Sequence, residues 1–376
     1  MTEDQLKALD GLYSGIEKDY GQGITIQEGK AITIPRIPLQ SISLKYLFGG
    51  GFPLGRVGEF FGPESTGKTT IWQLICADLQ SAGYNIAWID AEHAFDKEYA
   101  QKLGMKVDKE HFSLFVPDYG EQALDLAERC IDTKLFRLIV VDSVAALTPL
   151  AELEGDMTDQ QMGAQARMIG KGLRKIVAKG SKALSTLGLI NQIRMKIGVM
   201  FGNPETTPGG NSVKFFSSFR WDIRIVERLM DSEENHYGNR IRITSKKSKV
   251  SPPNRKVEFD LIFGKGIDII KDYIEFAVKF GVIQKSGTWY SYKEERLGQG
   301  IANATEMFRN NNELFQKIQK QVDDIVLPNC NYEDELSSIL TDAAEIIKEK
   351  KSRKGKKKED IEEKGDKDEN KDSNED

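Results

Sequence analysis

The chain has 376 residues, and its 53 Lys and Arg against 58 Asp and Glu give a formal net charge of −5 at pH 7. With 39% hydrophobic and 30% charged residues, it is long enough to bury a full core and predicts more than one domain. This composition excludes a wholly disordered, collagen-like or disulfide-stapled protein. It also argues against a uniformly basic nucleic-acid-binding surface, although a local basic groove remains compatible with it.

Charge is concentrated at the C-terminal end. Residues Lys348–Lys358 contain eight basic residues and one acid, a net charge of +7. Residues Glu359–Asp376 contain three basic and ten acidic residues, a net charge of −7. The two blocks cancel, so the rest of the chain carries the whole −5. Because hydrophobic residues nearly vanish after Ser352, we expect this tail to be disordered.

The three cysteines, Cys76, Cys130 and Cys330, form no CxxC pair. Reduced thiols in a cytosolic protein therefore explain them better than a zinc or redox site. No apolar run approaches the roughly 20 residues that span a bilayer, and Met1–Asp10 lacks a signal-peptide core. We expect a soluble, cytoplasmic protein with no membrane partner.

The first predicted element is an amphipathic helix over Asp4–Tyr20. Its apolar positions recur at helical spacing, and Gly21 and Gly23 end it. A short helix separated from the body by a loop must pack on something to be stable. The spacing leaves open whether this is the core of the same chain or a neighbouring subunit.

From Gly55 to Phe263 strands alternate with helices. The predicted strands are Arg56–Phe61, Asn85–Asp90, Ser113–Val116, Leu138–Val141, Leu187–Asn191, Phe219–Val226, Ile241–Lys246 and Glu258–Phe263, and the helices are Thr69–Ser81, Glu121–Cys130 and Gly163–Lys179. Short apolar strands separated by helices predict an α/β fold with a mostly parallel central sheet covered by helices on both faces. The late strands follow one another through turns, so we expect them to pair antiparallel at one edge.

Residues 266 to 333 read as a small α/β unit, with helices at Ile274–Phe280 and Asn303–Val326 and a β-rich segment at Thr288–Tyr292. We therefore divide the chain into an N-terminal helix and linker (1–33), an α/β core (34–265), this small C-terminal domain (266–333) and a helical, then charged tail (334–376).

One segment matches the phosphate-binding motif GxxxxGK[ST] in full: Gly62-Pro63-Glu64-Ser65-Thr66-Gly67-Lys68-Thr69. It follows a predicted strand and opens a predicted helix, which is the context the motif requires. Backbone N–H groups of such a loop surround a polyphosphate, and the helix N-terminus adds positive potential. Lys68 is expected to reach the β- and γ-phosphates and Thr69 to bind Mg²⁺, which predicts ATP and Mg²⁺ as cofactors.

Two further carboxylates follow apolar strands. Asp142 ends Leu138–Val141 and is expected to hold the magnesium through water. Glu92 lies just past strand Asn85–Asp90 and is our candidate for the general base that activates water. Asp90 and His93 remain alternatives, and the spacing does not separate an ATPase from a kinase that uses such a base on a second substrate.

A long segment without periodicity, Asn191–Asn211, follows another apolar strand. It mixes Arg194 and Lys196 with apolar Met195 and Ile197 and then runs through glycines. Loops of this length are usually functional. Basic groups beside exposed apolar side chains suit single-stranded nucleic acid, in which phosphates are gripped and bases are separated. A flexible lid is the alternative.

At this point the sequence resembles the bacterial RecA recombinases over Leu44 to Val326. The matching segments are Gly62–Thr70, Asp90–Ala94, Val140–Pro149, Gln192–Thr207, Trp289–Tyr292 and Gly298–Gly300. Gln192–Thr207 is the most specific of them. Three departures stand out: Pro208 replaces a usual Thr, the first-loop segment Gly155–Gln161 has its own side chains, and a basic block precedes the acidic tail.

The resemblance implies residue roles in ATP hydrolysis. The nucleotide would be held by Gly62, Pro63, Glu64, Ser65, Thr66, Gly67, Lys68, Thr69, Thr70, Asp96, Tyr99 and Asp142. Glu92 would polarise the attacking water, and Gln192 would sense the γ-phosphate. Lys247 and Lys249 would reach the γ-phosphate of the neighbouring subunit, with Phe215 at the interface. Without the resemblance, Lys246–Lys249 reads as a solvated charge run.

The resemblance also implies two DNA-binding loops, about residues 154–163 and 192–210. The residues expected at DNA are Met162, Arg167 and Arg174 from the first region and Arg194, Met195, Lys196, Ile197, Gly198, Val199, Gly209, Gly210 and Asn211 from the second.

The implied function is ATP-dependent homologous recombination and DNA repair. Subunits would polymerise on single-stranded DNA as a helical filament, pair it with homologous duplex and exchange strands with DNA-dependent ATP hydrolysis. The N-terminal helix would then pack on the next subunit. LexA-type repressors, cleaved in the SOS response, and single-strand-binding or mediator proteins are further expected partners. A ring helicase, a small-molecule kinase and a non-enzymatic ATP-switched DNA scaffold remain as alternatives.

Overall fold

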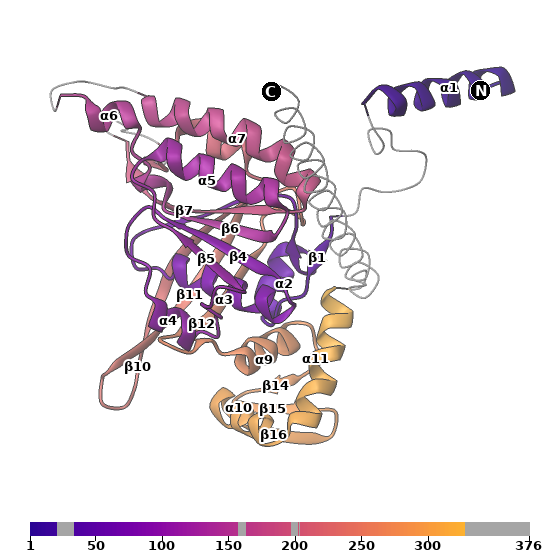
Figure 1. Cartoon of the computed structure of the whole chain (residues 1–376). Helices are drawn as coiled ribbons and strands as arrows, with labels where there is room; N and C mark the ends of the chain where they lie inside the picture. Colours follow the sequence, from indigo (N-terminus) through magenta and orange to yellow (C-terminus); the bar gives the residue numbers. More distant parts are fainter. Residues whose placement is uncertain (21–33, 157–162, 197–201, 203, 328–376) are drawn as a thin grey trace, which may run out of the picture. The chain divides into compact units, whose positions relative to one another are not determined.

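The computed structural model describes residues 1–20, 34–156, 163–196, 202 and 204–327 (Figure 1). The chain divides into two compact units, Met1–Ile34 and Pro35–Asp376. Among the described residues, no helix is long and apolar enough to cross a membrane.

The first unit contains helix α1 (Glu3–Tyr20), as the periodicity predicted. No residue of α1 is buried, and Leu6 and Leu12 expose 48% and 56% of their surface. Leu9, Tyr13 and Ile16 are half-buried, so the apolar stripe of this helix is partly exposed.

A nine-stranded sheet organises the second unit, in the order β13-β12-β11-β10-β3-β7-β6-β4-β5. Its strands are β3 (Val57–Gly62), β4 (Asn85–Asp90), β5 (Phe112–Phe115), β6 (Phe136–Asp142), β7 (Thr186–Gln192), β10 (Phe219–Met230), β11 (His236–Ser248), β12 (Lys256–Ile262) and β13 (Gly266–Ile267). Strands from β10 to β5 run parallel, whereas β10 to β13 pair antiparallel. This confirms the predicted mostly parallel α/β sheet with an antiparallel edge.

Helices cover both faces of this sheet. The first face carries α5 (Gly120–Thr133) and α7 (Ala164–Ala183), which lie side by side in Figure 1. Their apolar side chains join those of β4, β6 and β7 in one buried cluster. The other face carries α3 (Lys68–Ser81), whose Trp72 stacks on Phe60 of β3 with ring centroids 4.1 Å apart. Phe60 in turn stacks on Trp221 of β10 at 4.8 Å.

Residues 36–216 also contain several short elements, and most of them fall where we predicted no regular structure. They are β1 (Arg36–Ile37), α2 (Ile42–Phe48), β2 (Phe52–Pro53), α4 (Lys97–Lys102), the 3₁₀ turn η1 (Val144–Ala146), α6 (Leu150–Glu154), β8 (Arg194–Met195), β9 (Glu205–Thr206) and α8 (Gly210–Phe216). Segments of two to seven residues are too short for a periodic pattern to reveal them.

The C-terminal region contains α9 (Ile269–Lys279), a sheet of β14 (Gln284–Ser286), β15 (Trp289–Tyr292) and β16 (Glu295–Gln299), then α10 (Ile301–Asn310) and α11 (Asn312–Val326). The segment Asn303–Val326 is helical as predicted, but it is divided into two helices. Asn311 leaves the helical conformation, and its side chain accepts a hydrogen bond from Leu314 N–H, which starts a second helix.

This region is joined to the core by buried polar contacts. Lys45 of α2 forms an ion pair with Asp323 of α11, with Nζ and Oδ2 2.8 Å apart, and donates to the Tyr273 hydroxyl. The fully buried carboxyl of Asp272 on α9 accepts hydrogen bonds from the hydroxyls of Ser41 and Ser43.

Candidate nucleotide site and DNA-facing loops

The phosphate loop connects the C-terminal end of β3 to the first turn of α3. Gly67 precedes this helix with a φ of 87°, and no side chain caps the helix N-terminus. A Cβ atom at Gly67 would lie 2.6 Å from Leu261 Cδ2, so both the backbone conformation and the packing favour glycine here. The first N–H groups of α3 remain available to an anion, as a polyphosphate site requires.

Lys68 and Thr69 begin the helix and point at different partners. Lys68 Nζ donates hydrogen bonds to the carbonyls of Gly62 (3.3 Å) and Pro63 (2.6 Å) within the loop. Burial lowers the pKa of Lys68, although the nearby carboxylates Asp142 and Glu92 act in the opposite direction. Thr69 Oγ1 donates to Asp142 Oδ2 at 3.1 Å. The loop, α3 and the end of β6 thus converge on one point.

The donor set at that point suits a magnesium ion. Mg²⁺ prefers hard oxygen ligands, commonly one or two from the protein together with phosphate oxygens and water. The Thr69 hydroxyl and the Asp142 carboxylate supply such oxygens. Burial, with a smaller contribution from Glu92, raises the pKa of Asp142 to about 7. A divalent cation would lower it, because the ion favours the charged carboxylate. The described residues contain no cluster of three or more His, Cys, Asp or Glu that could bind a metal without the nucleotide.

Glu92 lies just after β4, the strand whose Asp90 is in register with Asp142 of β6. Its Oε1 accepts a hydrogen bond from the Ser143 hydroxyl and lies 3.3 Å from Gln192 Nε2. Glu92 is exposed to solvent, as a residue that meets a water molecule must be. Asp90 is buried and accepts the Phe95 N–H at 2.9 Å, which closes the turn after β4.

A pocket of about 220 Å³ adjoins the phosphate loop. Ser65–Thr70 line one side, and Tyr99 lies among the other lining residues. Asn239, Leu261 and Phe263 also line it, although the sequence predicted none of them as site residues. They come from β11 and the end of β12, and no local motif marks them. Asp96 is not among the lining residues; its side chain caps α4 by accepting the Tyr99 N–H.

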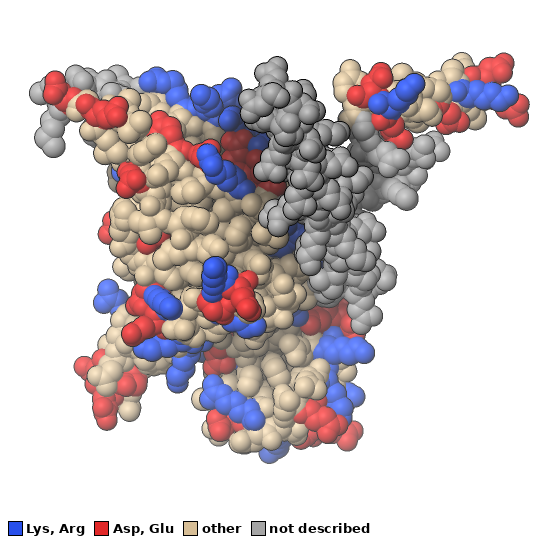
Figure 2. All heavy atoms as spheres, viewed as in Figure 1, with Lys and Arg blue, Asp and Glu red and all other residues tan. Residues whose placement is uncertain are grey.

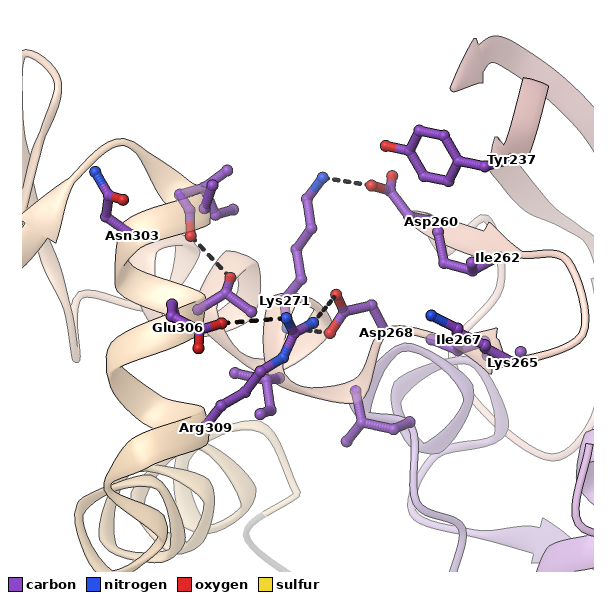
Figure 3. Close-up of a pocket in the computed structure, with 16 residues that line it drawn as sticks. Tyr237, Asp260, Ile262, Lys265, Ile267, Asp268, Lys271, Asn303, Glu306 and Arg309 are labelled. Atoms are coloured by element: carbon purple, nitrogen blue, oxygen red, sulfur yellow. Dashed lines mark hydrogen bonds and ion pairs between the residues drawn. The ribbon is translucent and has the colours of Figure 1, made fainter. Parts of the chain in front are cut away.

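A larger cleft of about 780 Å³ separates the end of β12 and α9 from α10 (Figure 3). Its charged side chains are largely paired with one another. Arg309 of α10 meets Asp268 at 3.2 Å and Glu306 at 3.4 Å, and Lys271 pairs with Asp260. This pattern describes a contact between the core and the C-terminal region rather than a phosphate site.

Basic residues dominate α7, which follows the predicted first DNA loop. The helix contains six of them and no acid, and Figure 2 shows Lys and Arg side chains over it. Lys175 and Lys179 pair with Glu128 of α5, whereas Arg167 and Arg174 are exposed and lie two turns apart on one face. Met162, predicted at DNA, lies outside the described residues.

The predicted second loop begins and ends beside α7 and the phosphate-loop strand. Its two ends pair as β8 and β9, and Arg194, Met195 and Lys196 are exposed. Gly209 and Gly210 lead into α8, where a Cβ at Gly210 would lie 3.0 Å from Ala166 of α7. Asn211 is exposed in the first turn of α8. The structure thus places α7, which follows the predicted first loop, next to α8, which follows the predicted second loop. The predicted DNA residues Ile197, Gly198 and Val199 lie outside the described residues.

Lys247 and Lys249 do not meet the phosphate loop of their own chain. The described residues that line the pocket beside the phosphate loop include neither Lys247 nor Lys249. Lys247 Nζ instead donates to the carbonyls of Lys214 (2.6 Å) and Phe215 (2.9 Å) at the end of α8. The Phe215 side chain is 71% exposed. These residues therefore form a separate surface next to an uncovered aromatic ring.

Comparison with known proteins covers nearly all of the described body. A family model described as the RecA N-terminal domain matches residues 7–268, and one described as the RecA C-terminal domain matches residues 271–326. Curated relatives named Protein RecA include those of Bacteroides thetaiotaomicron, 47% identical over 85% of this chain and 96% of the relative, and Treponema denticola, 46% identical over 87% and 79%. The relative from Wolbachia pipientis is 45% identical over 91% of this chain and 97% of its own length.

Proposed function

The chain belongs to the RecA family of recombination and repair proteins, and from this premise we propose that it hydrolyses ATP when bound to single-stranded DNA, polymerises on that DNA and exchanges its strand with homologous duplex. One contact carries the proposal most directly: Gln192 Nε2 lies 3.3 Å from Glu92 Oε1. Gln192 is where β7 enters the long loop, and Glu92 is the candidate water-activating group. The proposed DNA-binding loop and the proposed water-activating group are therefore linked by a single side chain, that of Gln192.

In the proposed nucleotide complex, the loop N–H groups and the N-terminus of α3 surround the β- and γ-phosphates. Lys68 leaves the Gly62 and Pro63 carbonyls for the phosphates, which replace these acceptors. Thr69 and, through water, Asp142 would hold Mg²⁺. When bound, the ion neutralises charge that develops on the phosphate oxygens.

The adenine and ribose occupy the pocket beside the phosphate loop. Tyr99 packs against the base, and Asp96 contacts it from the start of α4. Asn239, Leu261 and Phe263 complete the proposed pocket with one polar and two apolar side chains. An apolar slot with a few polar groups is typical of a nucleoside site.

Hydrolysis requires a water molecule near the γ-phosphate. Glu92 accepts its proton as it attacks, while the Ser143 hydroxyl holds one carboxylate oxygen of Glu92 in place. Gln192 shares this same oxygen. A loop movement that shifts Gln192 therefore changes the position of the base. This gives the DNA loop a physical route to the rate of hydrolysis.

DNA is proposed to bind where the two loop regions meet. Arg167, Arg174, Arg194 and Lys196 supply charge to the phosphates, and Met195, which is 65% exposed, separates bases. The nearby glycines and Asn211 admit the backbone closely. Each subunit makes few contacts, so affinity would come from many subunits along one strand.

Polymerisation would complete the ATP site in trans. Lys247 and Lys249 of one subunit are proposed to reach the γ-phosphate held by the next, with Phe215 buried at the interface. The partly exposed apolar stripe of α1 would pack on the neighbouring subunit. We propose that residues 1–33 serve oligomerisation, 34–265 form the ATPase core, 266–333 the small C-terminal domain and 334–376 the tail. The protein would be cytoplasmic. It would also stimulate cleavage of LexA-type repressors and bind single-strand-binding or mediator proteins.

Strand exchange tests this function. Single-stranded circles, ATP and Mg²⁺ are mixed with either homologous or unrelated linear duplex, and joint molecules are resolved on a gel. We expect products only with the homologous duplex. Glu92→Gln should lower steady-state ATP turnover by roughly a hundredfold or more while retaining nucleotide binding.

Other outcomes identify the alternatives. Unwinding of a fork without homology would indicate a helicase, and phosphate transfer to a metabolite without DNA would indicate a kinase. Unchanged turnover in Glu92→Gln would reject the assigned base.

A further inference from the structure

The second loop is held at both ends, and its two attachments differ. At its start, Asn191 donates to Glu59 of β3 (2.8 Å) and to the Pro208 carbonyl (3.1 Å). Near its far end, β9 pairs with β8, and Lys196 N–H donates to the Pro204 carbonyl at 2.9 Å. These contacts tie the loop to itself and to β3. One further contact ties β9 to a different strand of the sheet.

That contact is a two-pronged ion pair between Glu205 of β9 and Arg224 of β10. Arg224 NH1 donates to one carboxylate oxygen at 2.9 Å, and NH2 donates to the other at 2.6 Å. Nε of the same guanidinium donates to Asp222 at 2.6 Å. All three nitrogens of Arg224 are therefore used, and the plane of the guanidinium fixes the direction of β9.

The strand that carries this ion pair is part of the nucleotide site's framework. β10 lies next to β3, the phosphate-loop strand, with Asp222 in register with Phe61. Arg224 and Glu205 each expose 31% of their side chain, and Asp222 exposes 12%. Hydrogen bonds to Glu205 and then to Asp222 raise the pKa of Arg224, so the guanidinium is always charged. Glu205 is thus paired with Arg224, which is always charged and lies within a strand of the central sheet.

We propose that Arg224 is a positioning residue for the second DNA-binding loop: by clamping Glu205 to β10, it holds the far end of the loop in the orientation that receives single-stranded DNA. The inference rests on the proposed function of this loop. Arg224 does not contact DNA itself, because Glu205 and Asp222 occupy its guanidinium. Without the clamp, β9 keeps its pairing with β8 but loses its attachment to β10, so DNA must complete the ordering of this end when it binds, which costs affinity.

The chain offers a closely matched control. Arg242 of β11 is the cross-strand partner of Arg224 and forms an ion pair with Glu258 of β12 at 2.8 Å. Arg242→Gln removes the same charge and an ion pair from the same part of the sheet. Among the interactions recorded for Arg242, none involves the loop.

The experiment measures ATP turnover against the concentration of a short oligonucleotide. Arg224→Gln, Arg224→Lys and Glu205→Gln should each raise the half-saturating DNA concentration by roughly five- to tenfold, as loss of a charged two-pronged pair implies. The double variant Arg224→Gln/Glu205→Gln should be no worse than either single variant. Turnover at saturating DNA should stay within about twofold of wild type, as should all parameters of Arg242→Gln. Thermal unfolding establishes that each variant is folded.

Three results would overturn the clamp. The Arg224 and Glu205 variants could have the same half-saturating DNA concentration as wild type. The double variant could show additive losses. Arg224→Lys and Glu205→Gln could bind as wild type while Arg224→Gln lowers the salt slope by about one, which would make Arg224 a phosphate contact. If wild-type turnover does not respond to DNA, or Lys196→Ala leaves the DNA requirement unchanged, the proposed loop function itself fails and the clamp with it.

Discussion

The Thr69 hydroxyl donates a hydrogen bond to Asp142 Oδ2 at 3.1 Å, although 73 positions separate the two residues in the chain. One is in the first turn of α3 and the other ends β6. Parallel strands bring their C-terminal ends to the same edge of the sheet, which is why two distant sequence signals meet there. The contact joins the two protein oxygens proposed to hold magnesium.

Magnesium dependence should therefore vary with pH. The pKa of Asp142 is raised to about 7, chiefly by burial, and only the ionised carboxylate holds the cation well. As pH falls from 8 to 6, protons compete with Mg²⁺, so the half-saturating Mg²⁺ concentration for ATP turnover should rise by up to about tenfold per pH unit below 7. Asp142→Asn should need more Mg²⁺ at every pH and lose this dependence. An unchanged pH profile in that variant would contradict the assignment.

Gln192→Ala should separate DNA binding from ATP hydrolysis. Its amide contacts Glu92 and begins the loop, so its removal leaves both sites in place but breaks their connection. We expect stimulation of turnover by DNA to fall by roughly tenfold or more, with nucleotide affinity retained in a binding assay. Gln284→Ala, an exposed glutamine of β14, serves as the control. Full stimulation of ATP turnover by DNA in Gln192→Ala would refute the proposed link between the loop and Glu92.

Much of this arrangement is visible in the sequence. The phosphate loop, Asp142 and Glu92 each follow an apolar strand, and the fold brings strand ends together by rule. Asn239, Leu261 and Phe263 could not be predicted, because they reach the pocket from antiparallel strands whose register no local pattern reveals. Asp96 stays a prediction: one of its carboxylate oxygens accepts the Tyr99 N–H at the start of α4, a capping role that the sequence did not reveal.

The helix break at Asn311 also escaped prediction, since the apolar spacing continues through it from α10 into α11. Only the side-chain hydrogen bond from Leu314 N–H marks the new N-terminus. The clamp between Arg224 and Glu205 is another case. In the sequence, Glu205 is one polar residue of a long loop. The fold, and not a local pattern, determines that Arg224 is its partner.

Mixed filaments should reveal the proposed site in trans. Lys68→Ala removes a function of the subunit that holds the nucleotide, whereas Lys247→Ala and Lys249→Ala together remove a function of its neighbour. Each protein alone should turn over almost no ATP. An equal mixture should recover up to about a quarter of wild-type turnover, because a quarter of the interfaces combine two intact halves. Absence of any recovery, with co-assembly verified by labelled subunits, would place all these lysines in one subunit's site.

The buried carboxyl of Asp272 predicts a pH-dependent stability. Burial raises its pKa from 3.8 to about 6, despite hydrogen bonds from Ser41 and Ser43. Between pH 4 and 6 the folded chain keeps a proton that the unfolded chain loses, so this group's contribution to stability falls as pH rises through that window. Above pH 6 the loss is on the order of 3 kcal/mol.

Asp272→Asn should remove that contribution. Its free energy of unfolding, measured in urea relative to wild type, should therefore rise between pH 4 and 6 and then level off. Asp125→Asn, an exposed carboxylate of α5, should show no such trend. A constant difference between Asp272→Asn and wild type over this range would contradict the prediction.

The central claim is that this chain forms a helical filament on single-stranded DNA with ATP between subunits. Electron microscopy of the full chain with single-stranded DNA and a slowly hydrolysed ATP analogue tests it most directly. We predict continuous helical filaments that require both DNA and nucleotide and that weaken when α1 is removed. Closed rings, or particles no larger than single subunits under the same conditions, would contradict the claim.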